Sequence, residues 1–165
     1  MAALQEGTKA PEFSLTALDG SAFSLGSALR GAQALVVFFK VSCPVCQYMF
    51  PFFERLQISY GSAKVATVGI SQDNKAETAA FLRKYGASFP ALLEDPANPA
   101  ASNAYGIGKT PTWFLIAQDG EIRLSSEGWV RTDVEDLNRR IAEANRTSPR
   151  RLFRPGEGFP EFGGG

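Results

Sequence analysis

The sequence contains no histidine and only two cysteines, Cys43 and Cys46. Histidine is the commonest general base in enzymes, so its absence excludes serine or cysteine hydrolase chemistry that depends on a histidine partner. Seventeen basic and seventeen acidic residues give a formal net charge of zero. The composition therefore indicates no nucleic-acid partner, and the absence of a cationic run indicates no binding to a membrane surface.

The chain also lacks the long apolar stretches of a membrane protein. Its apolar runs are short and interrupted, so none is long enough to form a membrane-spanning helix. The first residues, MAALQEGTKAPEF, lack the basic start and apolar block of a signal peptide, which predicts a cytoplasmic protein. What is present suits one folded domain: 165 residues, 44% of them hydrophobic, with thirteen phenylalanines to fill a core.

Hydrophobic periodicity predicts alternating strands and helices along the chain. The predicted strands are a hairpin within 13–25, buried strands at 32–39 and 64–71, a short extended piece after Ser88, and a hairpin at 111–130. The predicted helices cover 44–60, 74–86, about 99–105 and 131–146. Asp19-Gly20 and Asp119-Gly120 supply the hairpin turns, and Asp133 is the expected N-cap of the last helix.

This order predicts an α/β domain over residues 1–148, with a central mixed β-sheet, helices on both faces and an N-terminal β-hairpin. Buried strands with apolar residues on both faces are typical of a sheet covered by helices. Residues 149–165 are rich in proline, glycine and phenylalanine without periodicity. We interpret them as an extended tail that can lie on the domain, with its last residues disordered.

The spacing of the two cysteines restricts what they can do. A closed zinc site needs about four ligands, and the chain offers no second Cys or His pair. Covalent haem attachment needs a histidine where Gln47 stands, so no cofactor is expected. A structural disulfide would close a loop of only four residues and stabilise the fold little. A redox dithiol is the favoured interpretation, and a pair of inert buried thiols is the alternative.

The cysteines also stand at the right place for redox chemistry. Cys43 follows a predicted strand and begins a predicted helix, where free backbone N–H groups and the helix dipole favour a thiolate. Pro44 suits the first helical turn because its missing N–H would have no partner there. Cys46 is one turn further on, on the same face and more buried. We therefore expect Cys43 to attack and Cys46 to resolve the resulting mixed disulfide.

Several segments together resemble the thioredoxin superfamily. VVFFKVSCPVCQYMFP resembles its strand–CxxC–helix motif, and Pro51 matches a proline found inside this helix in many members. GKTPTWFLIAQDGEI resembles the segment that carries the family's cis-proline, which implies a cis Thr110-Pro111 bond facing the cysteines. GTKAPEFSLTALDGSAFSLGSALRG resembles the N-terminal hairpin of the alkyl-hydroperoxide-reductase/thiol-specific-antioxidant and TlpA-like branch. The resemblance covers about residues 7–145 and implies a thioredoxin-like fold.

The chain departs from this branch at positions that matter for chemistry. Lys40 and Val36 replace the threonine and proline that precede the peroxidatic cysteine of peroxiredoxins, which weighs against peroxidase activity. Val37 and Met49 replace the acids that relatives place near the resolving cysteine. Ser42 stands where a tryptophan often precedes the first cysteine. The proton acceptor for Cys46 is therefore not evident from the sequence.

The leading functional hypothesis is a thiol–disulfide oxidoreductase in which Thr110 and Pro111 bind the extended backbone of a partner. Its partners would be protein disulfides or dithiols, or small thiols. Lys40 has two interpretations, a cation that favours the Cys43 thiolate or an ordinary surface lysine. Two alternatives stay open: a thiol peroxidase with an antioxidant role, in which peroxide oxidises Cys43 to a sulfenic acid, and a non-enzymatic redox-sensing module.

Overall fold

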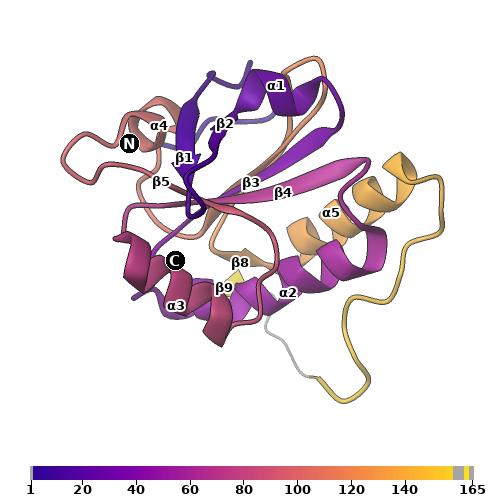
Figure 1. Cartoon of the computed structure of the whole chain (residues 1–165). Helices are drawn as coiled ribbons and strands as arrows, with labels where there is room; N and C mark the ends of the chain where they lie inside the picture. The colour runs from indigo at the N-terminus through magenta and orange to yellow at the C-terminus, as the bar shows by residue number, and fades with distance from the viewer. Residues whose placement is uncertain (1, 158–161, 164–165) are drawn as a thin grey trace.

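A mixed sheet of seven strands forms the centre of the protein, in the order β2-β1-β5-β4-β3-β6-β7 (Figure 1). The computed structural model describes residues 2–157 and 162–163 of the chain. The pairs β3–β4 and β4–β5 are parallel, and the other neighbouring strands are antiparallel. The strands are β1 (Ser14–Ala17), β2 (Ala22–Ser24), β3 (Gln33–Phe39), β4 (Val65–Ser71), β5 (Ala91–Leu93), β6 (Thr112–Ile116) and β7 (Ile122–Glu127).

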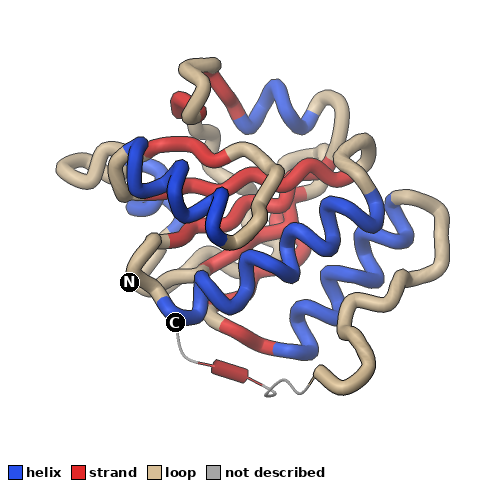
Figure 2. The backbone as a smooth tube through the Cα atoms, turned by 60° about the horizontal axis from the view of Figure 1, so that its bottom comes forward, coloured by secondary structure: helices blue, strands red, loops and turns tan. Residues whose placement is uncertain are grey.

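Helices cover both faces of this sheet, as the sequence predicts (Figure 1, Figure 2). Neighbouring residues of β3 show the division, because Val36 belongs to the core on one face and Val37 to the core on the other. Among the described residues, no helix has the length and apolar character needed to cross a membrane. The first face carries α1 (Leu25–Leu29) and α4 (Ala100–Tyr105), and the second carries α2 (Pro44–Tyr60), α3 (Lys75–Lys84) and α5 (Arg131–Ala144).

Two local predictions need correction. Helix α1 begins at Leu25, the last residue of the predicted hairpin, and extends over residues for which the sequence predicts no element; the Ser24 side chain accepts the Ser27 N–H and caps it. The N-cap of α5 is Val130 and not Asp133. The chain passes from the short strand β8 (Trp129–Val130) straight into the helix, so Asp133 falls within the first turn, where its carboxylate accepts the Ser126 hydroxyl at 2.6 Å.

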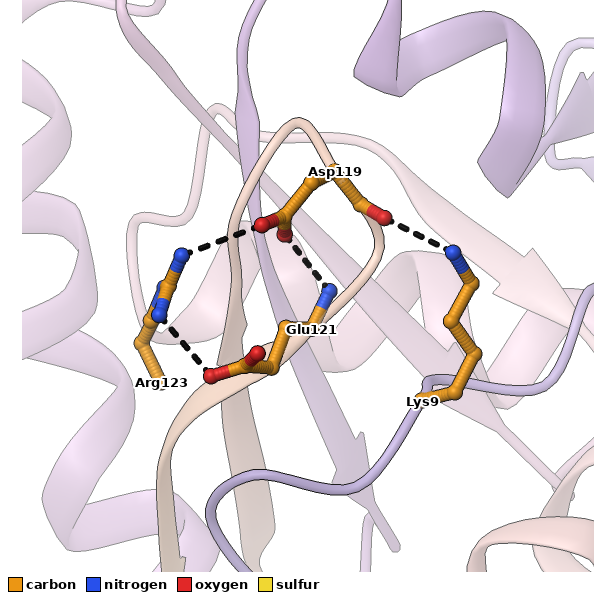
Figure 3. A network of polar contacts seen from close by, with 4 residues as sticks. All are labelled: Lys9, Asp119, Glu121 and Arg123. Atoms are coloured by element: carbon orange, nitrogen blue, oxygen red, sulfur yellow. Dashed lines mark hydrogen bonds and ion pairs between the residues drawn. The ribbon is translucent and has the colours of Figure 1, made fainter.

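The N-terminal segment runs beside β7, at the edge of the sheet. Its backbone exchanges hydrogen bonds with the β6–β7 turn, including Ala10 N–H to the Gly120 carbonyl at 2.8 Å. The Lys9 ammonium donates to the Asp119 carbonyl at 2.8 Å, and the Arg123 guanidinium holds the carboxylates of Asp119 and Glu121 (Figure 3). The segment therefore satisfies part of an edge strand whose backbone groups would otherwise be unpaired.

Aromatic side chains dominate the core beneath α2. Phe50 is fully buried and its ring contacts those of Phe39, Phe53, Phe81 and Phe89, with centroids 4.6 to 6.1 Å apart. These rings come from a strand, two helices and the segment before β5, so one side chain joins several elements. Phe50 therefore belongs to the interior of the protein.

Truncating Phe50 should therefore be costly. We expect Phe50→Ala to lower the free energy of unfolding by about 3–5 kcal/mol, because it removes a buried ring and leaves a cavity. Ile58→Ala on the same helix is the matched control, since Ile58 is 75% exposed, and it should change stability by less than about 0.5 kcal/mol. Urea denaturation of both variants provides the test, and equal losses would contradict this account of the core.

The C-terminal tail passes beside α5 (Figure 2) and contacts side chains of both α2 and α5. Leu152 is buried, and Phe153 lies against the rings of Phe52 and Trp129. Arg55 of α2 donates to the Leu152 carbonyl at 3.0 Å and forms a two-pronged ion pair with Glu157 at 2.9 and 2.7 Å. Strand β9 (Phe162–Gly163) pairs with β8. The disorder predicted for the last residues is thus wrong for 162–163, which form β9, while positions 164–165 lie outside the described residues.

The Arg55–Glu157 ion pair makes the attachment of the tail pH-dependent. Hydrogen bonds from Arg55, and then from the Arg154 N–H, lower the pKa of Glu157 from 4.5 to about 2. A detached tail would protonate at the higher value, so the contribution of the pair is complete above pH 4.5 and is lost as the pH falls toward 2. Hydrogen exchange of the amides of residues 150–157 should accelerate, relative to the core, over this interval.

The same measurement on variants separates the ion pair from a general effect of acid. Glu157→Gln should show several-fold faster exchange in the tail at neutral pH, while Glu143→Gln, an exposed acid on α5 with no ion pair among the described residues, should match the parent protein. An unchanged tail in Glu157→Gln would mean that Leu152 and Phe153 hold the segment alone.

Candidate active site

Cys43 lies where β3 gives way to α2 and acts as the N-cap of that helix. Its sulfur accepts the backbone N–H of Cys46 at 3.2 Å, and Pro44 occupies the first helical turn. An N-cap acceptor satisfies one of the helix's free N–H groups, and here the acceptor is the sulfur itself. The sulfur of Cys43 is thus held at the N-terminus of α2.

Two polar side chains that the sequence analysis did not single out hold the loop before Cys43. The Asp73 carboxylate accepts the Val41 N–H at 2.8 Å, and the Gln47 side chain donates to the Val41 carbonyl at 3.0 Å. Asp73 comes just after β4, which runs parallel to β3 with Ser71 opposite Phe39. Because the carboxyl ends of parallel neighbours meet at one edge of the sheet, this placement could have been found from the predicted strand order.

Cys46 is fully buried and lies in the core beneath α2, whereas Cys43 is 9% exposed. Both cysteines are free thiols in the structure. Burial raises the pKa of Cys46, and the neighbouring Cys43 raises it further, while the Lys40 backbone and the Thr110 side chain act in the opposite direction. Burial therefore limits both access to the Cys46 thiol and its ionisation.

The Thr110-Pro111 bond is cis, as the resemblance implies, and it faces the cysteines. The Cys43 thiol donates to the Thr110 carbonyl at 3.3 Å, which places the loop before β6 against the sulfur. The Pro111 carbonyl accepts the Gly128 N–H at 2.7 Å and ties this loop to the end of β7. Within the described part of the chain, the Thr110 N–H has no acceptor.

The side chains of the remaining predicted residues lie around the dithiol, and within the described residues none of them forms a hydrogen bond with either sulfur. Lys40 is exposed, and its carbonyl accepts the Cys43 N–H at 3.2 Å; its action on the Cys43 thiolate stays a prediction. Val37 and Met49, at the positions where relatives carry acids, are both fully buried in the same core as Cys46. The described residues contain no group of three or more metal-ligating side chains placed to hold an ion.

Apolar side chains surround the dithiol. Val41, Val45 and Tyr48 are half-buried and pack against the core that contains Cys43 and Cys46. Each could therefore contact both the interior and a docked partner.

A dithiol at a strand–helix junction, facing a cis-proline on this mixed sheet, defines a thioredoxin-like protein. The chain belongs to the Redoxin family, since residues 5–141 match the model of that family. It is 31% identical over 124 residues to the thioredoxin-like protein YneN of Bacillus subtilis, covering 73% of this chain and 70% of that protein. It is 29% identical over 140 residues to the thiol-disulfide oxidoreductase ResA of Geobacillus kaustophilus, covering 84% and 78%.

Comparison with solved structures also indicates a thioredoxin-like fold. A putative thiol:disulfide interchange protein DsbE from Chlorobium tepidum superposes with a TM-score of 0.74 at 28% identity, covering 86% of this chain and 98% of that one. A putative protein disulfide isomerase from Bacteroides thetaiotaomicron superposes with a TM-score of 0.78 at 26% identity, covering 88% and 95%. The thioredoxin-like fold predicted from the sequence is thereby confirmed.

The difference between the two thiols can be measured by alkylation. When the reduced protein reacts with limiting iodoacetamide near neutral pH, Cys43 should be labelled at least about tenfold faster than Cys46, because only thiolates react and burial holds Cys46 protonated. Peptide mapping by mass spectrometry reports the two sites separately. Faster labelling of Cys46 would reverse the roles assigned below.

Proposed function

We propose that this protein is a thiol–disulfide oxidoreductase in which Cys43 is the nucleophile and Cys46 the resolving cysteine. The observation that carries the proposal is the contact of the Cys43 sulfur with both the Cys46 N–H and the Thr110 carbonyl. One sulfur thus lies at a helix N-terminus, beside a second thiol and against a loop that can bind a peptide. The thiol–disulfide oxidoreductases among its relatives support the same activity.

The reaction requires two exchanges of sulfur. The Cys43 thiolate attacks one sulfur of a partner disulfide, forming a mixed disulfide and releasing the partner's other sulfur as a thiolate. Cys46, once deprotonated, attacks the Cys43 sulfur, forming the Cys43–Cys46 disulfide and releasing the second partner thiolate. Two electrons pass from the dithiol to the partner, and the same steps in reverse oxidise a dithiol.

Thr110 and Pro111 are proposed to bind the partner's backbone. The Thr110 N–H has no acceptor within the described residues, and the Thr110 carbonyl is occupied only by the Cys43 thiol. When Cys43 joins a mixed disulfide it no longer carries a hydrogen, so that carbonyl becomes free as well. An extended partner segment can then pair with both groups, as in other cases where a peptide adds to a strand.

Resolution is proposed to be the slower step. Cys46 is fully buried and burial raises its pKa, while Val37 and Met49 provide no carboxylate to accept its proton. The mixed disulfide should therefore accumulate during turnover, and acid quenching followed by mass spectrometry would detect it.

An antioxidant role, the use of peroxide and a cytoplasmic location remain predictions. Lys40 stands where peroxiredoxins of the resembled branch carry a threonine hydroxyl, so we propose disulfides and not peroxides as the main substrates. We also propose a redox function within the cytoplasm, which fractionation of cells followed by immunoblotting would test.

Insulin reduction measured beside peroxide consumption tests the activity. The reduced protein should accelerate insulin reduction by dithiothreitol and consume hydrogen peroxide far more slowly. Cys43→Ser should lose insulin reduction to background, because no other thiol is accessible, whereas Cys46→Ser should retain the first attack and accumulate a stable mixed disulfide. If Cys46→Ser formed no more mixed disulfide than Cys43→Ser, the assigned roles of the two cysteines would be wrong. If the protein consumed peroxide faster than it reduced insulin, the assigned activity would be wrong.

A further inference from the structure

A polar pocket of about 230 Å³ opens beside the dithiol. It lies between the end of β3, the segment after β4, helix α4 and the loop that leads to Pro111. Its volume is several times the ~30 Å³ that one water molecule occupies in the liquid, so it can hold a side chain or a chain terminus. Its polar lining includes Lys40, Gln72, Ser102, Asn103, Lys109 and Thr110.

Buried hydrogen bonds fix the floor of this pocket. Glu94 is 3% exposed, and its two carboxylate oxygens accept the backbone N–H and the hydroxyl of Ser102 at 2.7 and 2.6 Å. The Gln72 amide donates to the same hydroxyl at 2.9 Å. Ser102 and Gln72, which line the pocket, are therefore held in place by hydrogen bonds that end on the buried Glu94 carboxylate.

The rim of the pocket carries two cations. Lys40 and Lys109 are both exposed, and neither forms an ion pair within the part of the chain that the structure describes. The Asp73 carboxylate accepts the backbone N–H of Val41, the residue that follows Lys40. An anion entering the pocket would thus meet two ammonium groups that have no carboxylate partner of their own.

The pocket is also close to the reacting sulfur. Thr110 lines the pocket, and its carbonyl lies 3.3 Å from the Cys43 sulfur. Lys40 lines it as well, and its carbonyl accepts the Cys43 N–H. A strand advances ~3.3 Å per residue, so a group one or two residues from a partner cysteine bonded to Cys43 can reach the pocket.

We propose that this pocket binds a carboxylate carried one or two residues from the disulfide-bonded cysteine of the substrate. The inference rests on the proposed function, because the cysteine must first be bound at Cys43. Lys40 and Lys109 supply the attraction at the rim of the pocket. The site would make the protein select disulfides with acidic neighbours, whether these belong to a small thiol such as glutathione or to a protein.

A series of disulfide-linked peptide dimers provides the test. The peptides have blocked ends and the sequence Gly-X-Cys-X-Gly, with X being glutamate, glutamine or lysine. Their rates of reduction by the reduced protein are divided by their rates with dithiothreitol, which removes the intrinsic effect of charge on the disulfide. We expect the glutamate peptide to react about five- to tenfold faster than the glutamine peptide at low salt, and the lysine peptide most slowly.

Variants and added salt test whether the preference for the glutamate peptide arises at Lys40 and Lys109. Replacing both cations, with Lys40→Gln and Lys109→Gln, should reduce the glutamate preference to less than about twofold, and so should 1 M salt, where charges are screened within ~3 Å. Lys64→Gln is the matched control, because Lys64 is exposed at the opposite end of β4 and should keep the full preference. The salt experiment needs no variant and so does not depend on how a variant folds.

Other outcomes overturn the proposal in distinguishable ways. If all three peptides react at the same normalised rate, the pocket does not select carboxylates although the oxidoreductase activity stands. If none reacts, the proposed function itself fails. If Lys40→Gln slows iodoacetamide labelling and every peptide equally, Lys40 acts on the Cys43 thiolate and not on the substrate.

Glutathione disulfide distinguishes the source of the carboxylate. A charge-dependent preference for glutathione disulfide alone, lost in the double variant, would support a small acidic thiol as the ligand. A preference shared with the glutamate peptide would support acidic segments of proteins as well. A preference that survives in the double variant would assign it to another surface and contradict the pocket.

Discussion

The hydrogen bond from the Cys46 N–H to the Cys43 sulfur is the contact on which the site depends. It makes the nucleophile part of the helix, so that the position of the sulfur is set by the packing of α2 and not by a flexible loop. The aromatic core around Phe50 fixes that helix against β3. Asp73 and Gln47 fix the residues just before it. Reactivity at one atom is thus supported by contacts far along the chain.

The same arrangement gives the two thiols, Cys43 and Cys46, different surroundings and different proposed roles. Cys43 borders the loop of Thr110, where a partner can arrive, while Cys46 faces a core of apolar side chains. Burial disfavours ionisation of the second thiol, because a thiolate in the apolar core would lose its hydration. A site of this kind can hold a partner covalently for some time before releasing it.

The parts of the site that the sequence predicted are those governed by local patterns. An apolar strand followed by Pro44 and a helical pattern was enough to place Cys43 at a helix start, and family resemblance supplied the cis bond at Pro111. The residues that the sequence did not predict make contacts between segments that are far apart in the chain. Asp73 and Lys109 reach the site only because distant segments meet there, and α1 depends on one capping serine within a strand-like sequence. Such contacts have no signature in periodicity.

The edges of the sheet have a consequence for solubility. An enzyme that binds extended chains beside Thr110 risks binding copies of itself in the same way, because exposed strand edges template aggregation. In this protein the N-terminal segment covers part of β7, and the opposite edge is β2, which has only three residues. Within the described residues, neither edge of the seven-stranded sheet therefore offers a long row of unpaired backbone groups to a second copy.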